Sequence, residues 1–166
     1  MPSVYSAILS RSRECGNSRC KQIAIEAEAN QGVRRLALIV KSDGYEDLLL
    51  AFSFAGIAAS ADSDVVMFFT NRAARRLRRG ALADVGADDP VGKEFLAGAE
   101  SLGFRDLDEL LHSLKATGRV RIYLCSRGAR IWDIDLDNMA PEVDSVMGTA
   151  TFLLHEVPLA DRVLTI

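Results

Sequence analysis

The chain has 166 residues, of which 49% are apolar and 26% are charged, so it is long enough for one domain with a hydrophobic core. Its net charge of −3 gives no reason to expect a nucleic acid or an anionic membrane surface as a partner. Three cysteines cannot complete a disulfide framework within one chain, and this number fits thiol chemistry in a reducing compartment.

Residues 1–32 have mixed character, and we expect an N-terminal arm or extra helix there, outside a main domain that spans residues 33–166. No basic leader precedes a long apolar segment, and the longest apolar stretch, residues 48–59, is shorter than the roughly 20 residues that span a bilayer. We therefore expect a soluble, cytoplasmic protein without membrane insertion. Cys15 and Cys20 form a C-x4-C pair, but a zinc site normally needs four ligands. No metal or other cofactor is expected.

Residues 35–41 form a near-continuous apolar run, which is typical of a strand buried on both faces in a parallel sheet. The following turn contains Asp43 and Gly44, and Asp43 is a suitable N-cap for the next helix. That helix, residues 45–61, is apolar most of the way round, which indicates burial by the sheet and by a second partner such as another subunit. With a second strand at residues 65–69, these elements predict a right-handed βαβ unit.

An arginine-rich segment follows the second strand. Thr70 or Asn71 can cap a helix that ends at Gly80. This helix carries Arg72, Arg75, Arg76, Arg78 and Arg79. An anion-binding or nucleic-acid role is one interpretation of such a run. Because no aromatic residues interleave and the chain is acidic overall, we favour a solvated face, or a face that pairs with acidic residues of another subunit.

Further along, residues 92–102 and 107–116 predict helices, residues 120–124 a third strand, residues 149–154 a fourth and residues 162–166 a fifth at an edge. Asp133, Asp135 and Asp137 imitate the start of a calcium loop. Its sixth and twelfth positions hold Asn138 and Asp144, where an EF-hand has glycine and usually glutamate. Carboxylates that cap a short helix are the better interpretation.

The third predicted strand ends in Cys125, and a helix is expected to begin directly after it. Ligands of open α/β sheets bind beyond the carboxyl ends of the strands, where a following helix offers free backbone N–H groups. These groups, the helix dipole and the guanidinium groups of Arg127 and Arg130 would all favour a thiolate at Cys125. The alternative is a buried structural cysteine, since free cysteine behaves as a small hydrophobe.

Taken in order, ALIVKSDGYEDLLLAFSFAGIAA, VVMFFT, VRIYLCS and VMGTATFLL resemble the DsrE/DsrF-like sulfur-relay family, especially its small stand-alone members. The resemblance covers about residues 35–166. It implies a flavodoxin-like three-layer α/β/α sandwich with a mainly parallel sheet of four to five strands, and a homo-oligomer, commonly a trimer or hexamer. It also implies that Cys125 carries sulfur as a persulfide. The family often has a stretch like Phe-Thr-Phe-Trp-Gly after the second strand, where this chain has Thr70, Asn71 and the arginines.

We therefore predict a sulfurtransferase or sulfur carrier with Cys125 as the catalytic residue and with sulfur-donor and sulfur-acceptor proteins as partners. The residues expected to line its pocket are Ser126, Arg127, Asp43, Gly44, Thr70 and Asn71. One alternative is a non-catalytic oligomeric binding or scaffold protein of the same fold. Another is a thiol redox protein in which Cys125 pairs with Cys15 or Cys20.

Overall fold

The computed structural model describes residues 33–83, 85, 93–94, 97–98 and 106–166. The chain divides into two units, residues 1–32 and residues 33–166, and the description concerns the second. The expectations for residues 1–32, with Cys15 and Cys20, lie outside the described residues. Most of the helix predicted at residues 92–102 also lies outside them.

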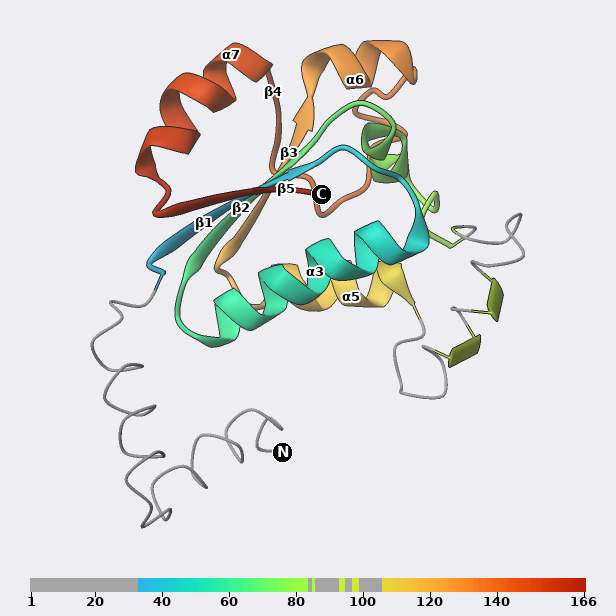
Figure 1. Cartoon of the computed structure of the whole chain (residues 1–166). Coiled ribbons are helices and arrows are strands. Elements are labelled where there is room, and N and C mark those ends of the chain that lie inside the picture. Colours follow the sequence, from blue (N-terminus) through green and yellow to red (C-terminus); the bar gives the residue numbers. More distant parts are fainter. Residues whose placement is uncertain (1–32, 84, 86–92, 95–96, 99–105) are drawn as a thin grey trace, which may run out of the picture. The chain divides into compact units, whose positions relative to one another are not determined.

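The described unit alternates strands and helices along the chain (Figure 1). The strands are β1 (Arg35–Val40), β2 (Asp64–Phe69), β3 (Val120–Cys125), β4 (Ser145–Met147) and β5 (Arg162–Thr165). The helices are α3 (Tyr45–Ser60), η2 (Ala73–Leu77), α5 (Leu107–Ala116), α6 (Ser126–Ile131), α7 (Thr149–Thr151), η3 (Phe152–Glu156) and η4 (Val157–Leu159).

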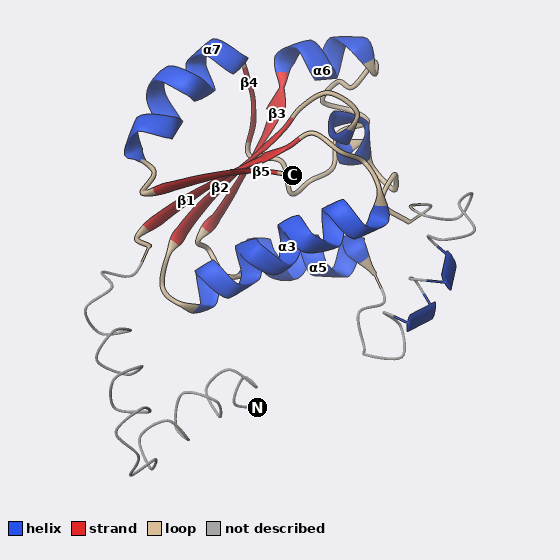
Figure 2. Ribbon diagram, viewed as in Figure 1, coloured by secondary structure: helices blue, strands red, loops and turns tan. Residues whose placement is uncertain are grey.

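The five strands form one sheet in the order β4-β3-β2-β1-β5, and every neighbouring pair is parallel. Figures 1 and 2 show α3 and α5 on one face of this sheet and α7 with the turns that follow it on the other. The predicted three-layer α/β fold with a parallel sheet is therefore confirmed. Because all strands run the same way, the segments that follow β1, β2, β3 and β4 leave the sheet at the same edge.

Each face of the sheet has its own apolar cluster. The larger cluster joins alternate residues of β1, β2 and β3, among them Leu38, Met67 and Ile122, to α3, α5, η2 and α6. The smaller cluster consists of Ala37, Val66, Phe68, Tyr123, Cys125 and Phe152. The rings of Phe68 and Phe152 stack with their centroids 4.4 Å apart, and this contact holds the α7–η3 segment to the sheet.

Residues 149–154 are helical, so the prediction of a fourth strand there is wrong. The fourth strand is the three-residue β4, directly before Gly148. Within the predicted strand only Phe152 is buried, while Leu153 and Leu154 are 57% and 68% exposed. The β-branched and apolar residues of this stretch are common in strands. In a strand, however, buried and exposed side chains alternate, whereas here one buried side chain is followed by two exposed ones.

Two further local predictions are also wrong. Asp43 does not cap α3, whose N-cap is Gly44, and its carboxylate instead contacts arginines. The arginine-rich segment is not a regular α-helix, because only residues 73–77 are helical and they form the short 3-10 helix η2. By contrast, the predicted edge strand near residues 162–166 is confirmed as β5, which pairs with β1.

Among the described residues, none of the helices has the length and apolar character needed to cross a membrane.

The helices η2 and α6 approach each other very closely at Gly128. A Cβ atom added to Gly128 would lie 2.6 Å from the Cβ of Ala74 and 3.6 Å from the Cβ of Cys125. Non-bonded carbon atoms normally stay about 3.5–4.0 Å apart, so only glycine fits here without a shift of one helix. Gly128 therefore sets the distance between the segment after β2 and the segment after β3.

We expect Gly128→Ala to lower the free energy of unfolding by about 1–3 kcal/mol, because the added methyl group overlaps backbone-anchored atoms. Gly56→Ala is the matched control. Its added Cβ would meet only Leu114 Cδ2 at 3.5 Å, and removal of a glycine inside a helix stabilises it by about 0.5–1 kcal/mol. Urea unfolding monitored by circular dichroism compares the two variants. Equal stability of Gly128→Ala and the wild-type protein would contradict the tight contact.

Candidate functional site

Cys125 lies at the carboxyl end of β3, which is flanked by β2 and β4. In the sheet register Cys125 is opposite Met147, the last residue of β4, and Leu124 is opposite Phe69, the last residue of β2. The residues that follow three adjacent strands therefore surround the thiol. This is the edge of a parallel sheet where ligands of open α/β proteins bind.

Two threonine hydroxyl groups reach the sulfur from the neighbouring strands. Thr149, the first residue of α7, places its Oγ1 3.6 Å from the Sγ of Cys125. Thr70, which directly follows β2 and is buried, also forms a hydrogen bond with the sulfur through its hydroxyl group. A hydroxyl group can donate to a thiolate, so both threonines can stabilise negative charge on the sulfur.

Burial and hydrogen bonding act in opposite directions on the pKa of Cys125. Burial is the largest single influence and raises the pKa, because it removes water from the thiolate. Four donors oppose it, and the net effect is a pKa below that of an ordinary thiol. They are the hydroxyl groups of Thr70 and Thr149 and the backbone N–H groups of Gly128 and Arg127. The thiol at this site therefore ionises more easily than an ordinary thiol.

Cys125 is also the N-cap residue of α6, so the first N–H groups of that helix have no partner within it. The sulfur does not form a side-chain capping hydrogen bond of standard geometry. The N–H groups of Arg127 and Gly128 nevertheless lie close enough to lower its pKa. The guanidinium groups of Arg127 and Arg130 are not among the groups that lower it, and both residues are exposed. Backbone N–H groups and hydroxyl groups, rather than charged side chains, lower the pKa of this thiol.

The thiol is fully buried, with a relative exposure of 0%. Its partner Thr149 is exposed and Ser126 is half-buried. The buried sulfur therefore has one exposed residue, Thr149, among its hydrogen-bond partners. A reagent reaches the sulfur only when neighbouring side chains move.

The structure separates the six residues predicted to line the pocket into two groups. Thr70 and Arg127 contact the sulfur, and Ser126 directly follows it in the chain. Asp43 instead binds arginines of the segment after β2, and Gly44 begins α3. The carbonyl oxygen of Asn71 accepts a hydrogen bond of 2.8 Å from the Nε1 of Trp132.

The arginine-rich segment pairs with Asp43 of the same chain, a partner that the local sequence did not predict. Four of its arginines are nevertheless exposed, as expected of a solvated face: Arg72, Arg75, Arg78 and Arg79. Pairing with acidic residues of another subunit stays a prediction. The Nε of Arg75 donates to Asp43 Oδ2 over 2.6 Å, and the Nε of Arg72 lies 3.3 Å from Asp43 Oδ1. The Nη2 of Arg76 lies 4.0 Å from Asp43 Oδ2. The carboxylate itself is only 8% exposed.

The sequence pattern misses Thr149 as a site residue because it predicts a strand at residues 149–154. The strand is β4, residues 145–147, and Gly148 and Thr149 follow it. Because Met147 of β4 is opposite Cys125 of β3, Thr149 lies near the thiol.

The carboxylates after Trp132 have different partners. Asp144 accepts hydrogen bonds from the Nζ of Lys115 and from the backbone N–H of Ile122, whereas Asp135 acts within its own turn. The Oδ1 of Asp135 accepts hydrogen bonds from the backbone N–H groups of Asp137 and Asn138, at 3.0 and 3.1 Å. Residues 136–138 form a turn, so the short helix predicted here is wrong, and Asp135 caps a turn instead. Within the described ranges, no three or more His, Cys, Asp or Glu side chains gather in a way that could hold a metal ion.

We expect Thr149→Val and Thr70→Val each to raise the pKa of Cys125, because each removes one hydroxyl donor while the burial remains. A hydrogen bond to a charged group contributes about 1.5–3 kcal/mol, which corresponds to a shift of about one pH unit or more. The rate of thiol alkylation against pH measures the midpoint, which should move to higher pH. Thr151→Val, in the same turn of α7, is the matched control and should leave the midpoint in place. If all three variants match the wild-type protein, the hydroxyl groups do not stabilise the thiolate.

The sequence profile of the DsrE/DsrF-like family matches residues 34–166, nearly the whole described unit. A search of curated proteins finds no significant match. Among solved structures, the fold resembles MTH1491, a protein of unknown function from Methanobacterium thermoautotrophicum, with 14% identity and a TM-score of 0.56 over 78% of this chain and 97% of that chain. It also resembles the ychN protein from E. coli, with 18% identity and a TM-score of 0.54 over 80% of this chain and 99% of that chain. Since the family profile covers most of the sequence, the chain belongs to the DsrE/DsrF-like family.

Proposed function

We propose that this protein is a sulfur carrier or sulfurtransferase that holds a sulfane sulfur on Cys125. The observation that carries the proposal is the set of four donors that lowers the pKa of a thiol at the ends of three adjacent strands. The family is associated with sulfur relay. A persulfide ionises more readily when hydrogen-bond donors surround it, so the groups that favour the thiolate also favour the loaded form.

The reaction is a thiol exchange in two steps. The Cys125 thiolate attacks the sulfane sulfur of a donor such as thiosulfate or a polysulfide. A new S–S bond forms, the donor's own bond to that sulfur breaks, and the donor leaves with the electron pair, as sulfite in the case of thiosulfate. An acceptor thiolate then attacks the outer sulfur of the Cys125 persulfide and releases the Cys125 thiolate. No external oxidant is needed, and the rate depends on thiolate supply and access.

Access of reagents to the Cys125 sulfur distinguishes this proposal from its main alternative. Full burial of Cys125 also suits a structural cysteine in a non-catalytic oligomeric binding or scaffold protein. A structural cysteine in an apolar site has a raised pKa, whereas the pKa of Cys125 is lowered. The exposed residue Thr149 contacts the sulfur. Rotation of its side chain away from the sulfur is a smaller motion than opening of the core. Both features favour the carrier.

We also propose that the protein works as a homo-oligomer of three or six chains. Helix α3 buries one side against the sheet, but Leu50, Phe54 and Ile57 are 37–45% exposed. Their spacing of four and three residues puts them on one side of the helix. A second copy that covers this row would complete the burial expected for a helix that is apolar on several sides.

Incubation with thiosulfate or polysulfide should add about 32 Da to the intact protein, and a reductant should remove it. Cys125→Ser should not gain this mass. Cys15→Ser/Cys20→Ser should gain it as the wild-type protein does, whereas loss in this double variant would favour the redox alternative. If the Cys125 thiol of the folded wild-type protein reacts neither with the sulfur donors nor with an alkylating reagent, the carrier proposal fails and the scaffold alternative stands.

Light scattering after size-exclusion chromatography tests the assembly. We expect three or six times the chain mass of 18.1 kDa, and a smaller mass for Phe54→Glu, which places a charge in the apolar row. Leu136→Glu makes the same kind of change at an apolar residue that is 82% exposed and lies outside α3, so it is the control and should keep the wild-type mass. A wild-type mass of one chain would contradict the oligomer.

A further inference from the structure

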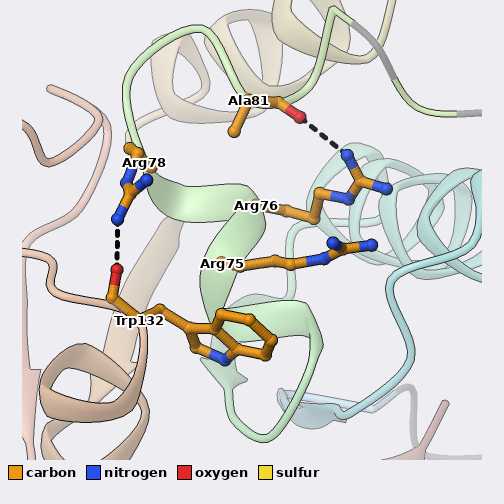
Figure 3. A pocket seen from close by; sticks show the side chains of 5 residues that line it. All are labelled: Arg75, Arg76, Arg78, Ala81 and Trp132. Carbon is orange, nitrogen blue, oxygen red and sulfur yellow. Dashed lines mark hydrogen bonds between the residues drawn. The ribbon is translucent and has the colours of Figure 1, made fainter.

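A second concave site lies at the same edge of the sheet, between the segments that follow β2 and β3. It is a cavity of about 310 Å³ lined by Arg75, Arg76, Arg78, Ala81 and Trp132 (Figure 3). The elements around it, η2 and α6, pack on the larger apolar cluster, while Cys125 belongs to the smaller cluster on the other face of the sheet. The cavity is therefore distinct from the cysteine site.

The charges around this cavity are predominantly positive. The buried carboxylate of Asp43 binds Arg75 and Arg76, which line the cavity, and also Arg72. One negative charge is thus shared among three guanidinium groups, and Arg78 adds a fourth positive charge. Arg75 keeps 46% of its side chain exposed although it binds Asp43, so an arriving ligand can reach its guanidinium group.

The arginines are oriented by their contacts and still have donors to offer. The Nε and Nη2 of Arg75 bind the carboxylate of Asp43. The Nη2 of Arg78 donates hydrogen bonds to the carbonyl oxygens of Trp132 and Asp133. A guanidinium group has five N–H donors, so in both side chains donors remain for a ligand. Pre-oriented guanidinium groups match the paired oxygen atoms of carboxylates and phosphates.

Trp132 adds a flat apolar wall to the cavity. Its Nε1 donates to the carbonyl oxygen of Asn71, which fixes the indole ring. The guanidinium carbon of Arg75 lies 5.7 Å from the centre of this ring, within the range of a cation–π contact. Figure 3 shows the indole ring and the Arg75 guanidinium group side by side. A ligand anion that reaches Arg75 would thus lie beside an aromatic surface.

We propose that this arginine–tryptophan pocket binds a small molecule in which a phosphate or carboxylate group is attached to a flat ring. The guanidinium groups of Arg75 and Arg78 bind the anionic group, and the indole of Trp132 packs against the ring. The volume of about 310 Å³ is at the lower end of the range of about 300–1,000 Å³ for small-molecule pockets, which suits a small metabolite. The proposal does not depend on sulfur chemistry at Cys125.

The chain has a single tryptophan, so its intrinsic fluorescence reports on this pocket directly. Phenyl phosphate and benzoate are the probes, and benzyl alcohol is the uncharged control. We expect a saturable fluorescence change with at least one of the two anions, half-complete below about 1 mM, that weakens as salt is added. Benzyl alcohol should give no saturable change in this range. The absence of saturation with both anions up to about 10 mM, ten times that value, would overturn the proposal.

Variants separate specific binding from general attraction to a basic segment. Arg75→Gln should weaken binding about tenfold or more, because it removes a charged donor to the anion. Arg79→Gln is the matched control, since Arg79 belongs to the same run but lines a different surface with Asp106 and Glu109. It should change the affinity less than about twofold, in line with a distant surface charge. Equal loss in both variants would overturn the proposal.

Two further variants test the role of the indole and the separation of the pocket from Cys125. Calorimetry with Trp132→Phe should show weaker binding of phenyl phosphate, and unchanged binding would exclude the indole as part of the site. Cys125→Ser should bind the probes as the wild-type protein does. Loss of binding in Cys125→Ser would mean that the two sites are one, which would overturn the separate pocket while leaving the sulfur-carrier proposal intact.

Discussion

The contact between Gly128 and Ala74 determines how the segments after β2 and β3 lie against each other. Because Gly128 has no side chain, α6 can approach η2 closely enough for both to pack on the same apolar cluster. One side of this contact holds Cys125 beside the first N–H groups of α6. The other side brings Trp132, just after α6, to the arginines of η2. Both candidate sites therefore depend on the close approach of α6 and η2 at Gly128, where a methyl group does not fit.

The parallel sheet explains how the pKa of Cys125 is lowered by neutral groups alone. Three strands end at one edge, so the residues that follow them converge on Cys125 from three sides. Hydroxyl groups and backbone N–H groups are small, neutral donors, and they can be buried at lower cost than a lysine or arginine. Together they outweigh the desolvation of the sulfur. Three arginines of the segment after β2 instead gather around Asp43, namely Arg72, Arg75 and Arg76.

Asp43 shows how a buried charge organises a loop. A lone buried carboxylate is costly, and the cost is removed when guanidinium groups supply hydrogen bonds and opposite charge. Asp43 follows β1 and its partners follow β2, so the ion pairs hold together two neighbouring strand ends. Arg76 also donates to the carbonyl oxygens of Asp43 and Ala81. The positive cavity is thus built on a well-connected polar cluster.

The sequence predicted most of the sheet but only part of the site. Near-continuous apolar runs such as residues 35–41 and 65–69 mark strands that are buried on both faces, and there the pattern is unambiguous. The short edge strand β4 has two exposed residues out of three, so it lacks the apolar run that marks a buried strand. The pattern therefore predicts the fourth strand in the next stretch, which contains Thr149.

Other features depend on contacts between distant parts of the chain. The strand-end position of Cys125 follows from local sequence, whereas its contact with Thr70 and Thr149 depends on the strand order β4-β3-β2. The hydrogen bond between Arg75 and Asp43 joins residues 32 positions apart. A suitable helix cap and a solvated basic face were reasonable local interpretations of these two segments, and neither could reveal that they bind each other.

The concealed position of Cys125 has a consequence for oxidative damage. A low-pKa thiolate that is open to solvent reacts with peroxide to a sulfenic acid, and further oxidation to the sulfinic and sulfonic acids is largely irreversible. With 0% of the residue exposed, the sulfur of Cys125 meets peroxide only while its cover is displaced. Burial thus opposes ionisation of the thiol and at the same time protects it from over-oxidation. Under the sulfur-carrier proposal, the cover that slows the approach of substrates would also limit irreversible oxidation of the cysteine.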